Sequence, residues 1–420
     1  MKLLIKGGRI VDPASGRDEV GDVFISEGKI SGKKEKADQT IDAKGLVVAP
    51  GLIDLAARLR EPGQEYKATL ASEMDAAVAG GVTSLACPPD THPPLDEPGL
   101  VDMLRRRAKA LARARVYPVG ALTVKLAGER LSEMSVLAQA GCVAFSQANV
   151  PITDTQVLWR ALQYAATFGY PVWLRAEDKW LSREGVAHDG EMATRLGLAG
   201  IPAFTETIAL ATMLQLARST GARVHFCRLS TAAALDMIRS AKKDKLPVTC
   251  DVGIHYVHLS ETDLGYYDTN CRLDPPLRSQ RDREALAAGL ADGTVDCVVS
   301  DHAPVDEDQK QLPFAEAEIG ASALELLLPL TLKWGAERKL PLVKTLARVT
   351  SDAARILGVQ SGRIAPGAPA DLVVFDPKQP WRVEPAALKS QGKNTPYLGY
   401  ELAGRVHATL VAGSVVYEQK

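Results

Sequence analysis

The feature that most limits the fold of this 420-residue chain is a series of eight short apolar segments separated by helical patterns. Each segment has the length of a β-strand, and apolar residues recur at helical spacing between them, as in 73–80 and 231–241. Repeated strand–helix units predict a parallel sheet, and eight of them predict a closed barrel. The predicted strands are one that ends at Asp54 and the segments 83–87, 116–119, 142–145, 171–174, 223–227, 247–251 and 296–300.

The two ends of the chain have a different pattern. Residues 1–49 and the last sixty residues read as short strands joined by turns, because apolar runs alternate with glycines there. Two β segments that flank a long α/β middle are expected to form one small sheet domain built from both termini.

Composition excludes several classes of function. A formal net charge of −1 gives no electrostatic reason to expect nucleic acid or an anionic membrane as a partner. The arginine-rich run 103–116 has helical spacing and is interpreted as a solvated helix face. No run of about 20 apolar residues occurs. Six scattered cysteines without a C-x-x-C pair predict buried thiols in a reducing compartment, and the chain is expected to be soluble and cytoplasmic.

A metal-site pattern begins at the first strand end but is incomplete. A strand end of the form P-G-x-x-D-x-H-x-H places two imidazoles on one side of a strand, where both reach a single Zn²⁺. This chain reads P-G-L-I-D-L-A-A-R over residues 50–58, so Ala56 and Arg58 occupy the two histidine positions. Alanine has no donor atom, and a guanidinium offers no lone pair to a metal.

The whole chain resembles the dihydroorotases, cyclic-amide hydrolases of pyrimidine biosynthesis within the amidohydrolase superfamily. The resemblance rests on L-R-E-P-G-Q-E-Y-K at 59–67, P-P-L-R at 275–278, D-H-A-P at 301–304 and G-R-I-A-P-G at 362–367. It implies an α/β fold: a TIM-type (β/α)8 barrel with its active site at the carboxyl ends of the strands. It also implies a small β-sandwich. We therefore assign residues 50–359 to the barrel domain and residues 1–49 and 360–420 to the composite sandwich.

The resemblance also implies a site in which a metal-bound hydroxide attacks a ring carbonyl while an aspartate moves the proton. Most of its ligand positions are altered here. The motif F-[ST]-D-D-G reads F-S-Q-A-N over 145–149, so Gln147 replaces an acidic ligand. The histidines of H-x-E-D and C-H-V-S-T are Arg175 and Arg228, and only Asp301 is retained.

Substrate positions are mixed. Arg60, which in the family binds the substrate carboxylate, is kept. Asparagines of the family are replaced by Asp90 and Asp274, and their negative charges are expected to oppose an anionic substrate.

Three arginines at one barrel mouth would repel one another if they were unpaired. We therefore hypothesise that Arg58, Arg175 and Arg228 form a guanidinium–carboxylate network in place of the metals. The acids expected to pair with them are Asp301, Asp274, Asp90, Asp251 and Glu177.

Other readings remain open for single residues. Asp301 could instead act as a base. His302 is expected to have a structural hydrogen-bonding role. His225 is a ligand only if it faces the barrel interior, and His255 retains a possible place in the pocket.

These replacements predict a chain that is not an enzyme and that needs no metal or other cofactor. The resemblance supplies a partner: inactive dihydroorotase-like chains serve as structural subunits of aspartate carbamoyltransferase. A homodimer within a mixed dodecamer with its catalytic chain is expected. The alternative is an active amidohydrolase that opens a cyclic amide with a degenerate single-metal or metal-free site. A ligand sensor that uses Arg60 is a third possibility.

Overall fold

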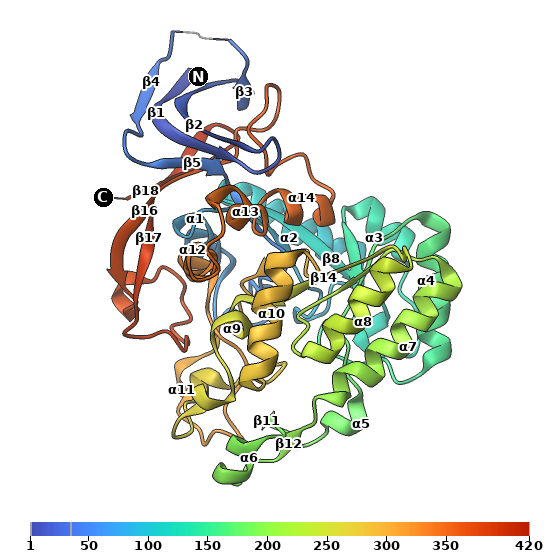
Figure 1. Cartoon of the computed structure of the whole chain (residues 1–420). Coiled ribbons are helices and arrows are strands. Elements are labelled where there is room, and N and C mark those ends of the chain that lie inside the picture. The colour runs from blue at the N-terminus through green and yellow to red at the C-terminus, as the bar shows by residue number, and fades with distance from the viewer. Residues whose placement is uncertain (1, 34–35, 420) are drawn as a thin grey trace.

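The computed structural model describes residues 2–33 and 36–419, and its centre is a parallel barrel (Figure 1). Within these residues, eight strands pair in the order β15-β14-β13-β10-β9-β8-β7-β6. They are β6 (Leu52–Asp54), β7 (Val82–Cys87), β8 (Arg115–Ala121), β9 (Ala144–Ser146), β10 (Val172–Leu174), β13 (Val224–Phe226), β14 (Val248–Gly253) and β15 (Cys297–Val299). Each predicted strand segment is found, so the expected (β/α)8 barrel is confirmed.

The barrel closes through residues that follow its first and last strands. Ala57 forms a parallel bridge with His302, and the Arg58 N–H donates to the His302 carbonyl oxygen at 2.9 Å. Deeper in the barrel, the Ser300 N–H donates to Asp54 Oδ1 at 3.0 Å. The segment that carries positions 56 and 58 is therefore fixed beside the segment that carries position 301.

One helix follows each barrel strand and covers the outside. Local signals define these helices: Thr69 and Ser72 form a capping box at α1, and Asp154 caps α4 by accepting from two backbone N–H groups. The outer helices are α1 (Leu70–Ala79), α2 (Pro98–Leu111), α3 (Met134–Ala140), α4 (Thr155–Phe168), α7 (Phe204–Thr220), α8 (Ala232–Lys243), α10 (Gln280–Asp292) and α12 (Leu327–Glu337).

Shorter elements lie in the connections. After β10 come α5 (Lys179–Ser182), β11 (Ala187–His188), α6 (Glu191–Leu196) and β12 (Gly200–Ile201). Later ones are α9 (Ile254–His258), α11 (Glu307–Lys310), α13 (Leu342–Ala347) and α14 (Ser351–Leu357).

The two ends of the chain meet in one sheet, at the top of Figure 1. Its order is β18-β17-β16-β5-β1-β2-β3, with β4 also paired to β1. The strands are β1 (Lys2–Asp12), β2 (Arg17–Ser26), β3 (Lys29–Ser31), β4 (Gln39–Asp42), β5 (Val47–Pro50), β16 (Leu372–Arg382), β17 (Glu401–Val411) and β18 (Ser414–Glu418). The antiparallel β5–β16 ladder joins the termini. The domain limits 1–49, 50–359 and 360–420 stay predictions.

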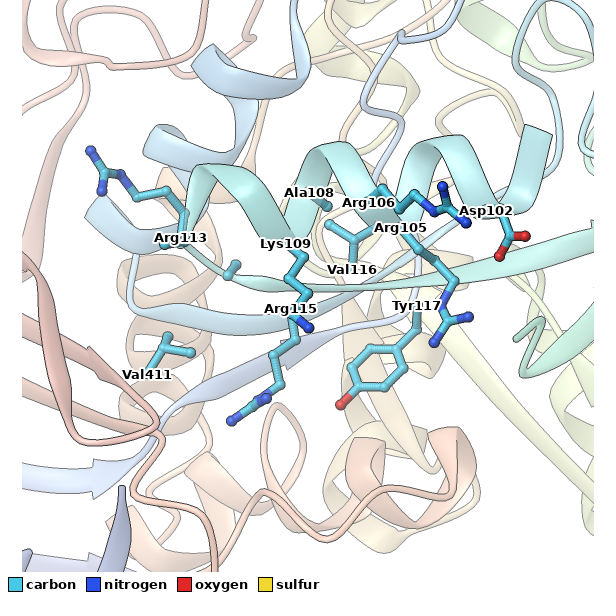
Figure 2. Close-up of a pocket in the computed structure, with 12 residues that line it drawn as sticks. Asp102, Arg105, Arg106, Ala108, Lys109, Arg113, Arg115, Val116, Tyr117 and Val411 are labelled. Carbon is cyan, nitrogen blue, oxygen red and sulfur yellow. The ribbon is translucent and has the colours of Figure 1, made fainter. Parts of the chain in front are cut away.

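Several expectations from composition can be compared with the structure. All six cysteines are free thiols and five are buried, as expected. No helix in the described part of the chain is long and apolar enough to cross a membrane. Arg105, Arg106 and Arg107 are exposed on α2, which confirms a solvated helix face for the part of the run up to Leu111. Figure 2 shows the first two of them on this helix.

His302 joins three parts of the fold. Its Nε2 bonds to Glu73 Oε2 at 2.6 Å, and its Nδ1 accepts the Ala323 N–H at 3.1 Å, which places the ring hydrogen on Nε2. Glu73 Oε2 also accepts the Ser390 hydroxyl at 2.7 Å. Because the His302 and Glu73 side chains are completely buried, the expected structural role of His302 is confirmed.

Replacing His302→Ala is therefore expected to lower the free energy of unfolding by about 3 kcal/mol, because it leaves the Glu73 carboxylate buried without its main partner. Denaturant unfolding followed by circular dichroism measures the loss. The matched control is Glu337→Gln, which removes the exposed Lys333–Glu337 pair and should cost less than about 0.5 kcal/mol. Equal losses in the two variants would contradict the role assigned to His302.

Candidate active site

A pocket of about 530 Å³ opens at the carboxyl ends of the barrel strands. Polar groups on the loops that follow β6, β7, β9, β13 and β15 converge in it, as expected for a (β/α)8 barrel. Its charged and amide side chains are Arg58, Arg60, Asp90, Asn149, Arg228, Arg272, Asp274, Asp301, Glu316 and Glu318.

Several residues of the site have an unusual backbone conformation. Arg60, Ala148, Arg228 and Asp301 all have positive φ angles, of 60°, 51°, 51° and 49°. Non-glycine residues rarely adopt this left-handed conformation, and where they do the surrounding structure must hold it in place. Three of the four residues line the pocket, so these turns belong to the construction of the site.

One carboxylate lies between two guanidinium groups at the centre of the pocket. Asp301 Oδ1 lies 3.1 Å from Arg228 Nη1 and 3.4 Å from Arg58 Nη1, and all three side chains are less than one-tenth exposed. Burial raises the pKa of Asp301, although the charges of Arg228 and Arg58 oppose that shift. For Arg228 the attraction of Asp301 and Asp274 outweighs burial and raises the pKa.

Asn149 is a residue of this centre that the sequence analysis did not identify. Its Oδ1 accepts a hydrogen bond from Arg58 Nη2 at 3.0 Å and another from Arg228 Nη2. It occupies the glycine position of the F-[ST]-D-D-G motif. The sequence could have indicated its role, because an amide side chain appears here directly after two positions that have lost their acids.

The predicted ion-pair network is confirmed for four of its five acids. Arg58 Nε bonds to Asp90 Oδ2 at 2.8 Å, and Arg175 pairs with both Glu177 and Asp274. Burial would raise the pKa of Asp90, but the neighbouring arginines outweigh it and lower the pKa.

The fifth acid, Asp251, was assigned wrongly. Its Oδ2 bonds to His225 Nε2 at 2.8 Å, and its Oδ1 accepts only the backbone N–H of Arg228, at 2.6 Å. Because β14 directs Asp251 into the barrel interior, its carboxylate pairs with the histidine of the neighbouring strand β13 instead of an arginine side chain.

Two other altered ligand positions, Gln147 and Ala56, form no ion pair with the central cluster. Gln147 faces away from the pocket: its Nε2 donates to the Leu126 carbonyl at 2.7 Å, and its Oε1 accepts the Thr123 hydroxyl at 2.9 Å. Ala56 lines a second, smaller cavity of about 30 Å³ that Arg58, Arg175 and Arg228 also line, so this position lies beside the central cluster.

Arg60 differs from Arg58, Arg175 and Arg228 because the acceptors of its described hydrogen bonds are uncharged. Nε donates to the Pro304 carbonyl at 2.8 Å, and Nη1 donates to Gln64 Oε1 at 3.1 Å. Burial and the nearby Arg58 lower its pKa. No carboxylate among the described residues lies within ion-pair distance of it, so its charge remains available to an anionic ligand.

The residues present do not fit the binuclear metal centre that the resemblance implies. A guanidinium cannot donate an electron pair, and arginines fill three of the ligand positions while alanine fills another. The guanidinium groups of Arg58 and Arg228 also already share Asp301, the one retained ligand.

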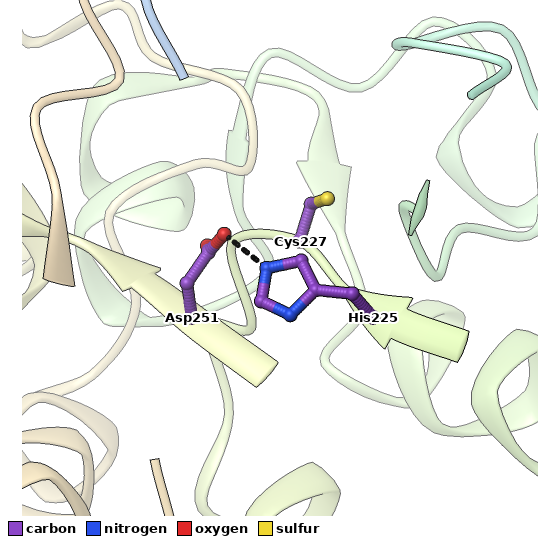
Figure 3. Close-up of side chains that lie close together, drawn as sticks. All are labelled: His225, Cys227 and Asp251. Carbon is purple, nitrogen blue, oxygen red and sulfur yellow. Dashed lines mark hydrogen bonds and ion pairs between the residues drawn. The ribbon is translucent and has the colours of Figure 1, made fainter. Parts of the chain in front are cut away.

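A different group of metal-type donors lies deeper in the barrel (Figure 3). Donor atoms of His225, Cys227 and Asp251 all lie within 4.8 Å of one another. However, His225 Nδ1 already bonds to Thr249 and its Nε2 to Asp251, each at 2.8 Å. Burial also raises the pKa of the Cys227 thiol well above its usual value. A metal ion would have to replace the His225–Asp251 bond, so the cluster has suitable donors but no free position.

His255 does not contribute to the pocket. Its ring is completely buried and stacks on Tyr397, with 5.7 Å between centroids. Burial lowers its pKa to about 3, so the ring stays neutral.

Comparisons with known proteins agree with this fold and extend it. A family model described as "Dihydro-orotase-like" matches residues 45–234, and one described as "Amidohydrolase family" matches residues 181–417. The solved structure of L-hydantoinase (dihydropyrimidinase) from Arthrobacter aurescens superposes with a TM-score of 0.89 at 23% identity, covering 99% of this chain and 96% of the other. That similarity shows the amidohydrolase fold.

Curated relatives are more similar in sequence. A protein named "Dihydroorotase" from Geobacter sp. (strain M21) is 42% identical over 100% of both chains. A "Dihydroorotase-like protein" from Pseudomonas aeruginosa is 43% identical, again over 100% of both. The chain therefore belongs to the dihydroorotase-like family of the amidohydrolase superfamily.

These relatives correct one expectation. The lost ligand positions had indicated that the chain is not an enzyme, but the full-length relatives at 42% identity are mostly named for an enzyme. The prediction failed because it equated loss of the metal ligands with loss of every catalytic group, whereas Arg60 and Asp301 remain in one pocket.

The central cluster can be tested through stability. Asp301→Asn is expected to lower the free energy of unfolding by about 3 kcal/mol, because two buried guanidinium groups lose their shared carboxylate. The control Asp236→Asn removes an exposed pair with Arg239 and should cost less than about 0.5 kcal/mol. Chemical denaturation measures both variants, and an Asp301→Asn protein as stable as the unaltered chain would contradict the proposed balance of charges.

Proposed function

We propose that the protein hydrolyses a cyclic amide that carries a carboxylate, in a dihydroorotase-like reaction that does not use the binuclear centre. The observation that carries this proposal is the buried Asp301 carboxylate between Arg58 and Arg228 in an open pocket. The full-length relatives named "Dihydroorotase" support dihydroorotate as the first substrate to test.

Each remaining group has a part in the proposed reaction. Arg60, whose charge is not neutralised by a contacting carboxylate, binds the carboxylate of the substrate. Asp301 accepts a proton from the water that attacks the ring carbonyl, and its buried position favours a carboxyl that can take up a proton. Arg58 and Arg228 donate hydrogen bonds to the oxygen that becomes negative.

The ring then opens by cleavage of the carbon–nitrogen bond. The nitrogen leaves with the proton that Asp301 received, so the carboxylate is restored and one water molecule is consumed. The product from dihydroorotate is an open-chain carbamoyl amino acid.

The expected result is slow hydrolysis of dihydroorotate by the purified protein in the presence of a metal chelator, which suppresses contaminating metal-dependent hydrolases. Asp301→Asn should abolish turnover, and Arg60→Ala should raise KM at least about tenfold because it removes a charge-assisted contact. Glu307→Gln, on the exposed helix α11, is the control and should leave both constants unchanged.

Absence of chelator-resistant turnover in the unaltered protein would overturn the proposal. Turnover that depends on bound zinc and is lost in Cys227→Ser would overturn it as well, because it would assign the chemistry to the His225–Cys227–Asp251 cluster.

A second candidate function is assembly. We propose that the chain binds the catalytic chain of aspartate carbamoyltransferase, as a homodimer within a mixed dodecamer, in the cytoplasm. The observation that favours it is that ion pairs of Arg58, Arg175 and Arg228 occupy the ligand positions, so the barrel can be stable without metal.

Mixing the purified chain with catalytic trimers of aspartate carbamoyltransferase should yield one larger species, measured by light scattering after size exclusion. Each component run alone is the control. Separate elution at micromolar concentrations of both proteins would contradict this assembly.

A further inference from the structure

A second large cleft lies at the opposite end of the barrel from the candidate active site. Its volume is about 540 Å³, within the range of small-molecule sites. It is bounded by α2, by the start of β8 and by the end of β17, so it lies where the barrel meets the terminal sheet. The lining residues include Arg105, Arg106, Lys109, Arg113 and Arg115.

The charges of this cleft are only partly neutralised. Arg115 forms a two-point ion pair with the buried Asp371, at 2.9 and 3.1 Å, and Arg113 lies 2.6 Å from Asp75. Asp102 is the single carboxylate among the lining residues. Positive charge therefore remains in excess.

Three cations on α2 account for this excess. The side chains of Arg106 and Lys109 form no hydrogen bond or ion pair with any described residue, and the Arg105 side chain donates only to the Ala140 carbonyl, at 2.6 Å. Arg105 and Lys109 are four residues apart on one helix, a spacing at which like charges destabilise the helix. A bound anion would remove that repulsion.

The side chains also converge. Figure 2 shows Arg105, Lys109 and Arg115 extending from α2 and β8 toward the same side as the ring of Tyr117. Guanidinium groups bind phosphate oxygens in pairs, and an ammonium adds a third point of charge. Tyr117 and Val411 supply an apolar wall beside the cations.

We propose that this cleft binds a small polyphosphate, with its phosphate groups held by Arg105 and Lys109 and by Nη1 of Arg115, the one guanidinium nitrogen of that residue that can donate and that the ion pair with Asp371 does not use. The inference does not depend on the proposed hydrolysis, because the cleft and the active site share no lining residue. Inorganic tripolyphosphate and the triphosphate of a nucleoside share this chemistry. Only the nucleoside has a base that can contact the ring of Tyr117, so this residue distinguishes the two ligands.

Isothermal titration calorimetry with adenosine triphosphate and with inorganic tripolyphosphate tests the site. Binding of either probe is expected, weakened at least about tenfold by Lys109→Glu and also by raised salt. Lys243→Glu, on the exposed end of α8, is the matched charge reversal and should leave binding unchanged. Thermal unfolding confirms that each variant is folded.

The variant Tyr117→Leu separates the two sources of phosphate. If Tyr117→Leu binds adenosine triphosphate more weakly than the unaltered protein does but binds tripolyphosphate equally well, the site is assigned to nucleotides. If the variant binds each probe as tightly as the unaltered protein does, the site recognises the polyphosphate alone. The proposal is overturned if neither probe binds at millimolar concentration, or if Lys109→Glu binds as the unaltered protein does. Tighter binding of a single-stranded oligonucleotide that spans α2 would also overturn it, because the cleft would then be part of a nucleic-acid surface.

Discussion

The balance between buried positive and negative charge at the barrel mouth determines the form of the candidate site. Arg58 and Arg228 are both taken out of water, and an opposite charge in contact with them offsets the cost of that burial. Asp301 provides that contact for both, and Asn149 satisfies further donors of the same two groups. Asp301, Asn149 and Asp90 therefore lie in the pocket as hydrogen-bond and ion-pair partners of these two guanidinium groups.

This balance also explains the difference between Arg60 and its neighbours. The cations that lie where metal ligands stand in the family are matched by carboxylates, whereas Arg60 contacts only a carbonyl and an amide. Arg272, in the same pocket, also donates only to carbonyl oxygens. Positive charge without an ion pair on these two arginines favours a ligand with negative charge near them. The expected repulsion by Asp90 is reduced for the same reason, since Arg58 neutralises it.

Much of the fold was predictable from the sequence because its signals are local. Runs of apolar residues between helical patterns located the eight strands, and the charge argument located four of the five acids that pair with arginines. Asp251 and Asn149 were missed because their partners depend on which strands are adjacent and on how one turn bends. The orientation of Gln147 away from the pocket depends on the loop of Leu126, which no periodicity reveals.

The left-handed turns at Arg60, Ala148, Arg228 and Asp301 have a consequence for redesign. A substitution at Arg228 or Asp301 places the new side chain on a left-handed main chain that already lies at the pocket. At Arg228, returning an imidazole would therefore change the side chain and its charge while the turn itself is already present. The turn at Arg228 is thus a property of the main chain that a redesigned side chain would have to accommodate.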